Sequence, residues 1–422
     1  MNFKPQIQTQ KSGLRILTYN IPQSQSVTAM LLVKVGSRCE SDQIAGISHF
    51  LEHLVSKGTR KYKTALDLAV KLDSVGAEHN AFTSKEYTGF YVKSATAHLA
   101  LALDILSELV WQPLLRQEDI VKEKGVILEE IKMYNDMPMF KVARDFERLI
   151  FKDTNLGREV IGFKKSVINL KQKDFVDFRK IWYQPQNMVL GIVGGLPKKL
   201  PVIKTGSFNK NVKADFKKFT FSQKKQEVKI RYKKTQQAHF CLGFRALPKG
   251  HIDRYILAVL TTILGGNMSS RLFTEVRENR GLAYYIKSDI STYFDNGYFL
   301  TQAGVDTVKV DSSIKVILQE LEKIKTGKNS ISERELKRAK EYLKGKLALS
   351  LEDSKDVVSF FTEDMLLEDK IRTPKAIIKE VEKVTVSDLK RLAKAIFTKN
   401  FLNLAVIGPY KDKSKFEKYI KL

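Results

Sequence analysis

The chain has 422 residues, of which 43% are hydrophobic and 28% are charged. This is the composition of an ordinary globular protein, and it excludes wholesale disorder and fibrous repeats. Lys and Arg number 73 against 47 Asp and Glu, a formal net charge of +26. Such a charge suits polyanionic partners, but the lysines are spread along the chain and no nucleic-acid-binding motif accompanies them. We therefore interpret the charge as a lysine-rich surface and expect no nucleic-acid partner.

Cysteine content and hydropathy indicate the compartment. Cys39 and Cys241 are too few for a disulfide framework and fit a reducing environment. No stretch reaches the roughly 20 apolar residues of a membrane span, and the N-terminal residues lack the apolar core of a signal peptide. We expect a soluble, cytoplasmic protein that has no membrane partner.

In chain order, the first half contains both strand and helix patterns. Alternation of apolar and polar residues predicts strands at 26–34 and 87–94, and helical periodicity predicts helices at 45–56, 64–74, 97–110 and 117–133. Strands and helices do not alternate one for one. The pattern therefore favours antiparallel or mixed sheets packed against helices on one face, an α+β fold.

Short segments of the two halves match in the same order. LLVKVGSR at 31–38 resembles AHFCLGFR at 238–245, GFYV at 89–92 resembles GYFL at 297–300, and the apolar run ending at Gly194 resembles the one ending at Gly408. The two members of each matching pair are about 210 residues apart, which indicates two copies of one unit. A lysine-rich segment with turn residues lies between them. We assign residues 1–205 to an N-terminal repeat, 206–222 to a linker and 223–422 to a C-terminal repeat.

The run ISHFLEHL at 47–54 carries the clearest chemical signal. His49 and His53 are four residues apart, so on a helix their side chains share one face at a spacing that suits two ligands of one metal ion. Glu52 borders the same face and can act on a water molecule beside the metal. The alternative is a pair of exposed or hydrogen-bonded histidines. We favour the metal site, because six histidines occur in the chain and two of them flank this glutamate.

A third ligand is expected from the helical segment at 120–134. At about 100° per residue, Glu130 lies about 20° from Glu123, on the apolar face, whereas Glu129 lies about 120° away, towards solvent. A glutamate on a buried face needs a partner, and a metal ion is one. The alternative is that Glu123 and Glu130 pair with lysines at the edge of this face.

The chain resembles the pitrilysin, insulysin and mitochondrial-processing-peptidase family of zinc metallopeptidases, which carry an inverted His-x-x-Glu-His motif. The resemblance covers nearly the whole chain and rests on four segments: HFLEH at 49–53, EKGVILEE at 123–130, NAFTS at 80–84 and RENRGLAY at 277–284. The chain is similar to the short, two-repeat members of bacterial type.

The resemblance implies a role for each matching residue. His49, His53 and Glu130 would bind one Zn²⁺ per chain, Glu52 would be the general base, and Glu123 would orient a ligand histidine. An edge strand would pair with the substrate backbone through Asn80, Ala81 and Phe82. The second repeat would bind no zinc but would contribute two groups that bind the substrate and stabilise the oxyanion, Arg277 and Tyr284.

The residues alone leave the role of the second repeat open. Arg277 and Tyr284 are two helical turns apart if the segment is helical, but Gly281 argues against a continuous helix. Without the resemblance, Arg277 would pair with Glu275 or Glu278, and Tyr284 would belong to the core.

The activity implied by the resemblance is zinc-dependent endoproteolysis of extended or unfolded peptides. Members with two repeats commonly associate, so a homodimer or a heterodimer with a related chain is expected. The alternative is a non-catalytic relative that acts as a partner subunit or binding protein. The intact Glu52 and the three candidate ligands favour the enzyme.

Overall fold

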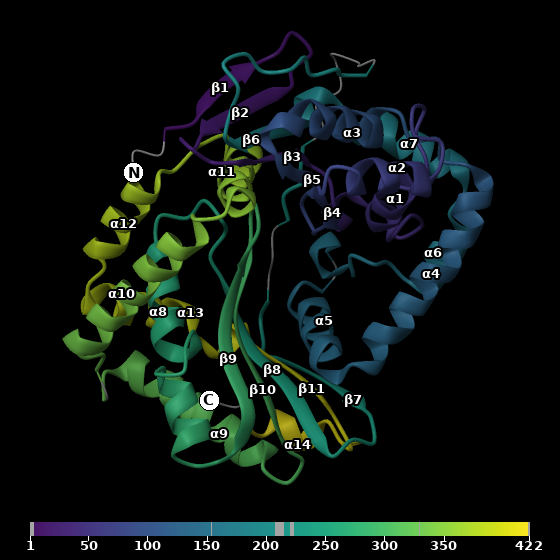
Figure 1. Ribbon diagram of the computed structural model, residues 1–422. Coiled ribbons are helices and arrows are strands. Elements are labelled where there is room, and N and C mark those ends of the chain that lie inside the picture. Colours follow the sequence, from purple (N-terminus) through teal and green to yellow (C-terminus); the bar gives the residue numbers. More distant parts are fainter. Residues whose placement is uncertain (1–3, 153, 207–214, 220–222, 329, 421–422) are drawn as a thin grey trace. The chain divides into compact units, whose positions relative to one another are not determined.

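The computed structural model describes residues 4–152, 154–206, 215–219, 223–328 and 330–420 (Figure 1). Most of the predicted linker at 206–222 lies outside the described residues. The chain forms two compact units. The first comprises Met1–Ile131, Arg158–Lys217 and Leu347–Pro374, and the second comprises Lys132–Gly157, Lys218–Lys346 and Lys375–Leu422.

A six-stranded sheet forms the centre of the first unit, in the order β1-β2-β6-β3-β5-β4. Its strands are β1 (Gln6–Thr9), β2 (Arg15–Asn20), β3 (Ser26–Val33), β4 (Glu78–Thr83), β5 (Thr88–Ala95) and β6 (Met188–Gly194). The pair β2 and β6 is parallel and the other neighbours are antiparallel. Seven of the eight residues of β3 and all of β6 are buried, because both faces of the sheet are covered.

Helices from both halves of the sequence cover this sheet. The unit contains α1 (Ile47–Val55), α2 (Ala65–Asp73), α3 (Leu99–Trp111), α6 (Lys164–Asn169), α7 (Gln172–Trp182), α11 (Ser354–Glu368) and most of α4 (Gln117–Asp136). The four helices predicted in the first half are therefore present. No helix among the described residues is both long enough and apolar enough to span a membrane.

The second unit repeats the same strand order. Its sheet runs β7-β11-β8-β10-β9, formed by β7 (Glu227–Tyr232), β8 (Gln237–Ala246), β9 (Ala283–Thr292), β10 (Gly297–Asp306) and β11 (Leu402–Gly408). The first sheet has β1 as an additional edge strand, and its remaining order β2-β6-β3-β5-β4 corresponds strand for strand to β7-β11-β8-β10-β9. In each of these five-strand orders the first two strands are parallel and the other neighbours are antiparallel. The predicted α+β fold with two related repeats is confirmed.

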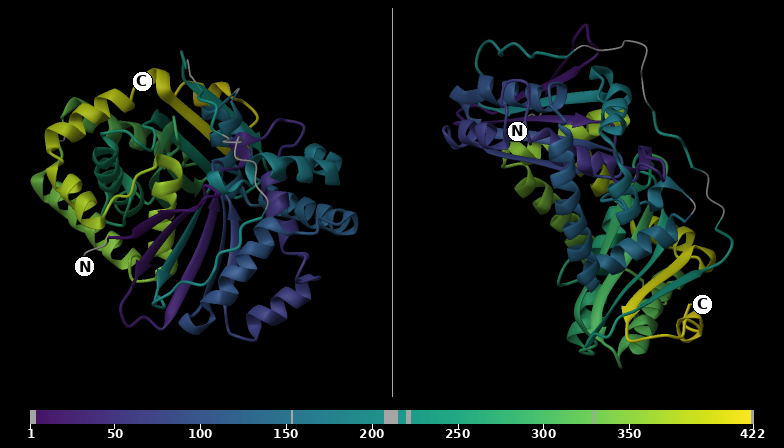
Figure 2. Two further views of the ribbon diagram at one scale, coloured as in Figure 1. Left: turned by 90° about the horizontal axis from the view of Figure 1, so that it is seen from above. Right: turned by 90° about the vertical axis from the view of Figure 1, so that its right-hand side faces the viewer.

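The second sheet also has buried residues on both of its faces; Figure 1 and Figure 2 show the ribbon of this sheet and its helices from three sides. Phe240 and Leu242 point into the larger core, whereas Cys241 between them points into a smaller core on the opposite face. The larger core includes residues of α8 (Arg254–Gly265), α9 (Val310–Thr326), α10 (Glu333–Ser350), α12 (Pro374–Lys383) and α13 (Val386–Ile396). The smaller core includes residues of α5 (Pro138–Ile150). The short helix α14 (Ser414–Glu417) lies near the C-terminus.

Each unit takes one helix from the other half of the sequence. In the first unit, α11 packs on β3 and β6, and Thr28 Oγ1 lies 2.8 Å from Ser354 Oγ. In the second unit, α5 packs on β7, β8 and β11, and its buried Asp145 accepts hydrogen bonds from Arg231 Nε at 2.6 Å and Nη2 at 2.8 Å. These exchanged helices cover a second face of each sheet, beyond the one face that was predicted.

Candidate metal centre

The short helix α1 is held in place by its apolar side and by its N-terminus. Phe50 is fully buried, and its ring meets that of Phe175 edge to face at 4.9 Å. At the N-terminus, Gly46 takes a φ of 93°, which favours glycine. The buried carboxylate of Glu40 accepts hydrogen bonds from the backbone N–H groups of Gly46 at 2.7 Å and Ser48 at 2.9 Å. These contacts fix the helix whose opposite side carries the histidines.

Three candidate ligand atoms converge between α1 and α4 in the first unit. Glu130 Oε2 lies 3.6 Å from His49 Nε2 and 3.8 Å from His53 Nε2, and the ligand atoms of the three residues lie within 4.8 Å of one another. A tetrahedral zinc ion with ligands at about 2.0–2.1 Å separates them by about 3.3 Å. The donor set and its spacing therefore fit zinc. The predicted phase of α4 is also found, since Glu123 is buried and Glu129 is exposed.

Glu123 contacts His53 at Nδ1, the ring nitrogen on the side away from the ligand cluster. Its Oε2 lies 3.2 Å from His53 Nδ1, and its Oε1 lies 2.7 Å from Lys57 Nζ. Burial would raise the pKa of Glu123, but the hydrogen bonds from His53 and Lys57 outweigh it and lower the pKa. The hydrogen bond to Glu123 in turn raises the pKa of His53. A hydrogen bond at Nδ1 leaves Nε2 as the atom directed towards Glu130.

Glu52 lies one turn along α1, beside the ligand cluster. Thr83 at the end of β4 donates a hydrogen bond of 2.5 Å to Glu52 Oε2. Burial raises the pKa of Glu52, while the Thr83 hydroxyl and the neighbouring His53 act against that rise. A carboxylate with a raised pKa can accept a proton and release it again within one reaction cycle.

The three residues predicted to bind substrate lie on β4. This strand is at the edge of the sheet, and within the described part of the chain its one strand neighbour is β5. Asn80 is exposed and Ala81 is half-buried. Phe82 is also half-buried and meets the ring of Tyr87 edge to face at 6.0 Å. An edge strand can pair with an added extended chain through its backbone, and here the Ala81 N–H donates a hydrogen bond of 2.8 Å to Asn80 Oδ1.

Arg277 and Tyr284 lie in the second unit. Arg277 belongs to a π-helical segment, Phe273–Glu278, where its guanidinium lies 4.9 Å from the centre of the Phe273 ring and 3.8 Å from Glu278. The helical segment ends before Gly281, which has a φ of 55°, and Tyr284 follows on β9 with 74% of its surface exposed. The two residues therefore do not share a helix, and their catalytic role stays a prediction.

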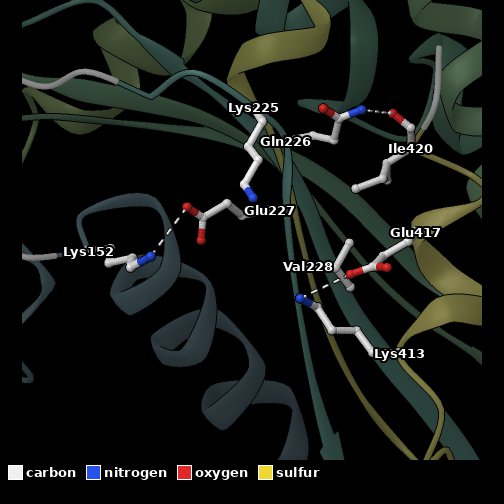
Figure 3. Close-up of a pocket in the computed structure, with 8 residues that line it drawn as sticks. All are labelled: Lys152, Lys225, Gln226, Glu227, Val228, Lys413, Glu417 and Ile420. Carbon is white, nitrogen blue, oxygen red and sulfur yellow. Dashed lines mark hydrogen bonds and ion pairs between the residues drawn. The ribbon is translucent and has the colours of Figure 1, made fainter.

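A pocket of about 470 Å³ in the second unit carries no comparable chemistry. Figure 3 shows its lining at the start of β7 and beside α14. Lys413 pairs with Glu417 at 3.1 Å, and Lys152 lies 3.6 Å from Glu227. Its charged groups thus largely neutralise one another.

Sequence reasoning assigned no role to three residues that support the centre, namely Glu40, Lys57 and Thr83. Thr83 was visible within the NAFTS segment, and Lys57 follows His53 by four residues, a spacing at which helical side chains meet. Glu40 acts through a loop, so no periodic pattern could have identified it.

Two family descriptions match the chain. Residues 15–164 match "Insulinase (Peptidase family M16)", and residues 169–343 match "Peptidase M16 inactive domain". A Bacillus subtilis protein named "Uncharacterized zinc protease YmxG" is 35% identical over 410 residues, 95% of this chain and 97% of that protein. A Streptomyces coelicolor protein, also named an uncharacterized zinc protease, is 34% identical and covers 96% of this chain and 90% of its own.

Solved structures have the same fold. The crystal structure of a protease from Helicobacter pylori aligns with a TM-score of 0.90 at 25% identity, covering 96% of this chain and 99% of that one. A peptidase M16 inactive domain from Pseudomonas fluorescens aligns with a TM-score of 0.86 at 18% identity, covering 97% and 99%. These similarities extend over both units of the chain.

Proposed function

Because the chain belongs to the M16 family of peptidases, we propose that it is a zinc metalloendopeptidase that hydrolyses extended or unfolded peptides. The observation that carries the proposal is the convergence of His49, His53 and Glu130 within 4.8 Å, with Glu52 on the same helix. The names of the relatives support zinc as the metal. Two imidazoles and one carboxylate also form a ligand set found in catalytic zinc sites.

Side chains of the first unit are proposed to bind the metal, to transfer the proton and to orient a ligand. A zinc ion held by His49, His53 and Glu130 would supply Lewis-acid polarisation of water and of the peptide carbonyl. Glu52 takes the proton of the attacking water and delivers it to the leaving amine. Glu123 fixes His53 in the tautomer that leaves Nε2 unprotonated.

Substrate binding is proposed to use both units. The backbone of β4 around Asn80, Ala81 and Phe82 pairs with the peptide as an added strand. Arg277 and Tyr284 bind the substrate and offset the negative charge that develops on the carbonyl oxygen. Extended chains pair with a strand edge more readily than folded ones, so unstructured peptides are the expected substrates.

We further propose that the chain works as a dimer, with a second copy or a related chain. The proposal extends the resemblance to two-repeat family members, and the alignments cover 97% and 90% of the two relatives' own lengths, so neither relative is much longer than this chain. Light scattering of the purified protein should give twice the chain mass if the partner is a second copy. A monomer that cleaves peptides at full rate would contradict this proposal.

The central experiment compares wild type with Glu52→Gln and Glu129→Gln. Both variants lose one negative charge, but Glu129 is exposed on α4 and faces away from the cluster. Wild type and Glu129→Gln should cleave a pool of unstructured peptides, lose activity with chelator and regain it with zinc. Glu52→Gln should bind zinc but fail to cleave. Zinc binding without cleavage by wild type would instead favour a non-catalytic family member, and absence of zinc binding would refute the ligand set.

A further inference from the structure

The hydroxyl of Thr83 donates a short hydrogen bond to the proposed general base, Glu52. Its 2.5 Å distance to Glu52 Oε2 is in the range of hydrogen bonds to a charged oxygen. Both groups are partly buried. A hydrogen bond to a charged acceptor is stronger than one between neutral groups. The Thr83 hydroxyl therefore restrains the orientation of the Glu52 carboxylate.

The position of Thr83 links the base to the strand expected to bind substrate. Thr83 is the last residue of β4 and pairs with Thr88 on β5. Side chains alternate along a strand, so Thr83 shares a face with Ala81, and Asn80 and Phe82 point to the other. In the first unit α1 contacts β4, and the Thr83–Glu52 hydrogen bond is a direct side-chain link between them.

A glutamate side chain has several rotatable bonds, and fixing its carboxylate in one orientation costs conformational entropy unless a partner holds it. One carboxylate oxygen must face the attacking water during proton transfer. If Thr83 binds Oε2, Oε1 is the oxygen left to take the proton.

We propose that Thr83 is a positioning residue, which orients the Glu52 carboxylate for proton transfer and couples that orientation to the position of β4. The inference rests on the proposed peptidase function. It assigns Thr83 no contact with the metal. Its effect is therefore on the catalytic step and on transition-state binding, and zinc content and ground-state peptide affinity remain unchanged.

The test uses the full, zinc-loaded chain with Thr83→Val, Thr83→Ser and Thr9→Val. Valine keeps the β-branched shape without the hydroxyl, and serine restores the hydroxyl. Thr9 is the matched control, because it ends β1 at the opposite edge of the same sheet and is exposed. Thr83→Ala serves as a second variant if valine impairs folding. Measured quantities are kcat, KM, bound zinc, the thermal midpoint and the affinity for a phosphinic peptide that mimics the tetrahedral transition state.

Thr83→Val should lower kcat by about 10- to 100-fold, the factor that corresponds to losing one charge-assisted hydrogen bond. Its KM, zinc content and thermal midpoint should match those of wild type, and its affinity for the phosphinic peptide should fall in parallel with kcat/KM. Thr83→Ser should restore most of kcat, and Thr9→Val should behave as wild type. In a Glu52→Gln background, Thr83→Val should leave the affinity for an ordinary peptide unchanged.

Several results would overturn the inference. One is a kcat equal to that of wild type in both Thr83→Val and Thr83→Ala, and another is a Thr83→Ser variant whose kcat is as low as that of Thr83→Val. An equal fall of kcat in Thr9→Val, or a loss of bound zinc in Thr83→Val, would also overturn it. A raised KM at constant kcat would make Thr83 a substrate contact instead. If wild type itself does not cleave while holding zinc, the proposed function fails and this inference fails with it. Cleavage by wild type and none by Glu52→Gln keeps the two separable.

Discussion

Replacing Glu123 with glutamine should weaken zinc binding without removing a ligand. In the structure, Glu123 is 5% exposed and contacts both His53 Nδ1 at 3.2 Å and Lys57 Nζ at 2.7 Å. Glutamine can still accept a hydrogen bond from His53, but its NH₂ group then faces the Lys57 ammonium. The variant therefore loses the charge that holds His53 and gains a donor opposed to a cation.

The expected loss of zinc affinity is about 10- to 100-fold, the usual effect of removing a partner that orients a ligand. This factor corresponds to about 1.4–2.7 kcal/mol. The assay is competition for zinc between the metal-free protein and a chelator of known affinity, at one pH and ionic strength. Glu129→Gln is the control, because it removes the same charge from an exposed position on the same helix.

The difference between the two variants isolates the contact with His53 from the general effect of charge on a chain of net charge +26. Equal affinities in wild type and Glu123→Gln would refute the assigned role. Equal losses in Glu123→Gln and Glu129→Gln would show that only long-range electrostatics was measured.

Three further predictions concern stability. Burial raises the pKa of Glu40 to about 7 from 4.5, so its contribution to folding stability is greatest below pH 4.5 and is lost as the pH rises through about 7. Denaturation of wild type and Glu40→Gln across this range should show wild type losing up to about 3 kcal/mol of stability relative to the variant. A stability difference that does not change with pH would contradict the shift. Phe50→Ala should cost about 3–5 kcal/mol in urea unfolding, because the ring is fully buried against Phe175, and a loss below 1 kcal/mol would mean that the site collapses. Gly191→Ala would bring a methyl group within 2.3 Å of Val358 on α11, so thermal unfolding should show a loss of about 1–3 kcal/mol, whereas an unchanged midpoint would mean that α11 shifts freely.

Local periodicity predicted the parts of the centre that depend on single elements. The phase of α4 separates buried Glu123 from exposed Glu129, and the helix carrying His49 and His53 lies within the predicted range. These predictions hold because the helical period decides which side chains share a face, whatever the helix packs against. The strand predicted at 26–34 likewise corresponds to β3.

Tertiary placement could not be predicted in the same way. Periodicity marks the apolar face of α11 but does not say which sheet covers it, so the exchange of α5 and α11 was missed. The match between the short segments 31–38 and 238–245 also aligned residues that are not structurally equivalent. Gly36 follows the end of β3, whereas Gly243 lies inside β8. The hydrogen bond from Thr83 to Glu52 joins residues 31 positions apart, beyond the reach of any local pattern.

The exchange of helices also affects the order in which the chain can fold during its synthesis. β6 ends at Gly194 and α11 begins at Ser354, so 354 − 194 = 160 residues are added between them. At about 5–20 residues per second, a ribosome needs about 8–32 s for that interval. During this time the face of β3 and β6 that α11 later covers, including Met30 and Gly191, lacks its cover. The unit that carries the candidate metal centre is therefore completed only after most of the second unit has been made, and a nascent chain in that interval presents apolar surface to chaperones.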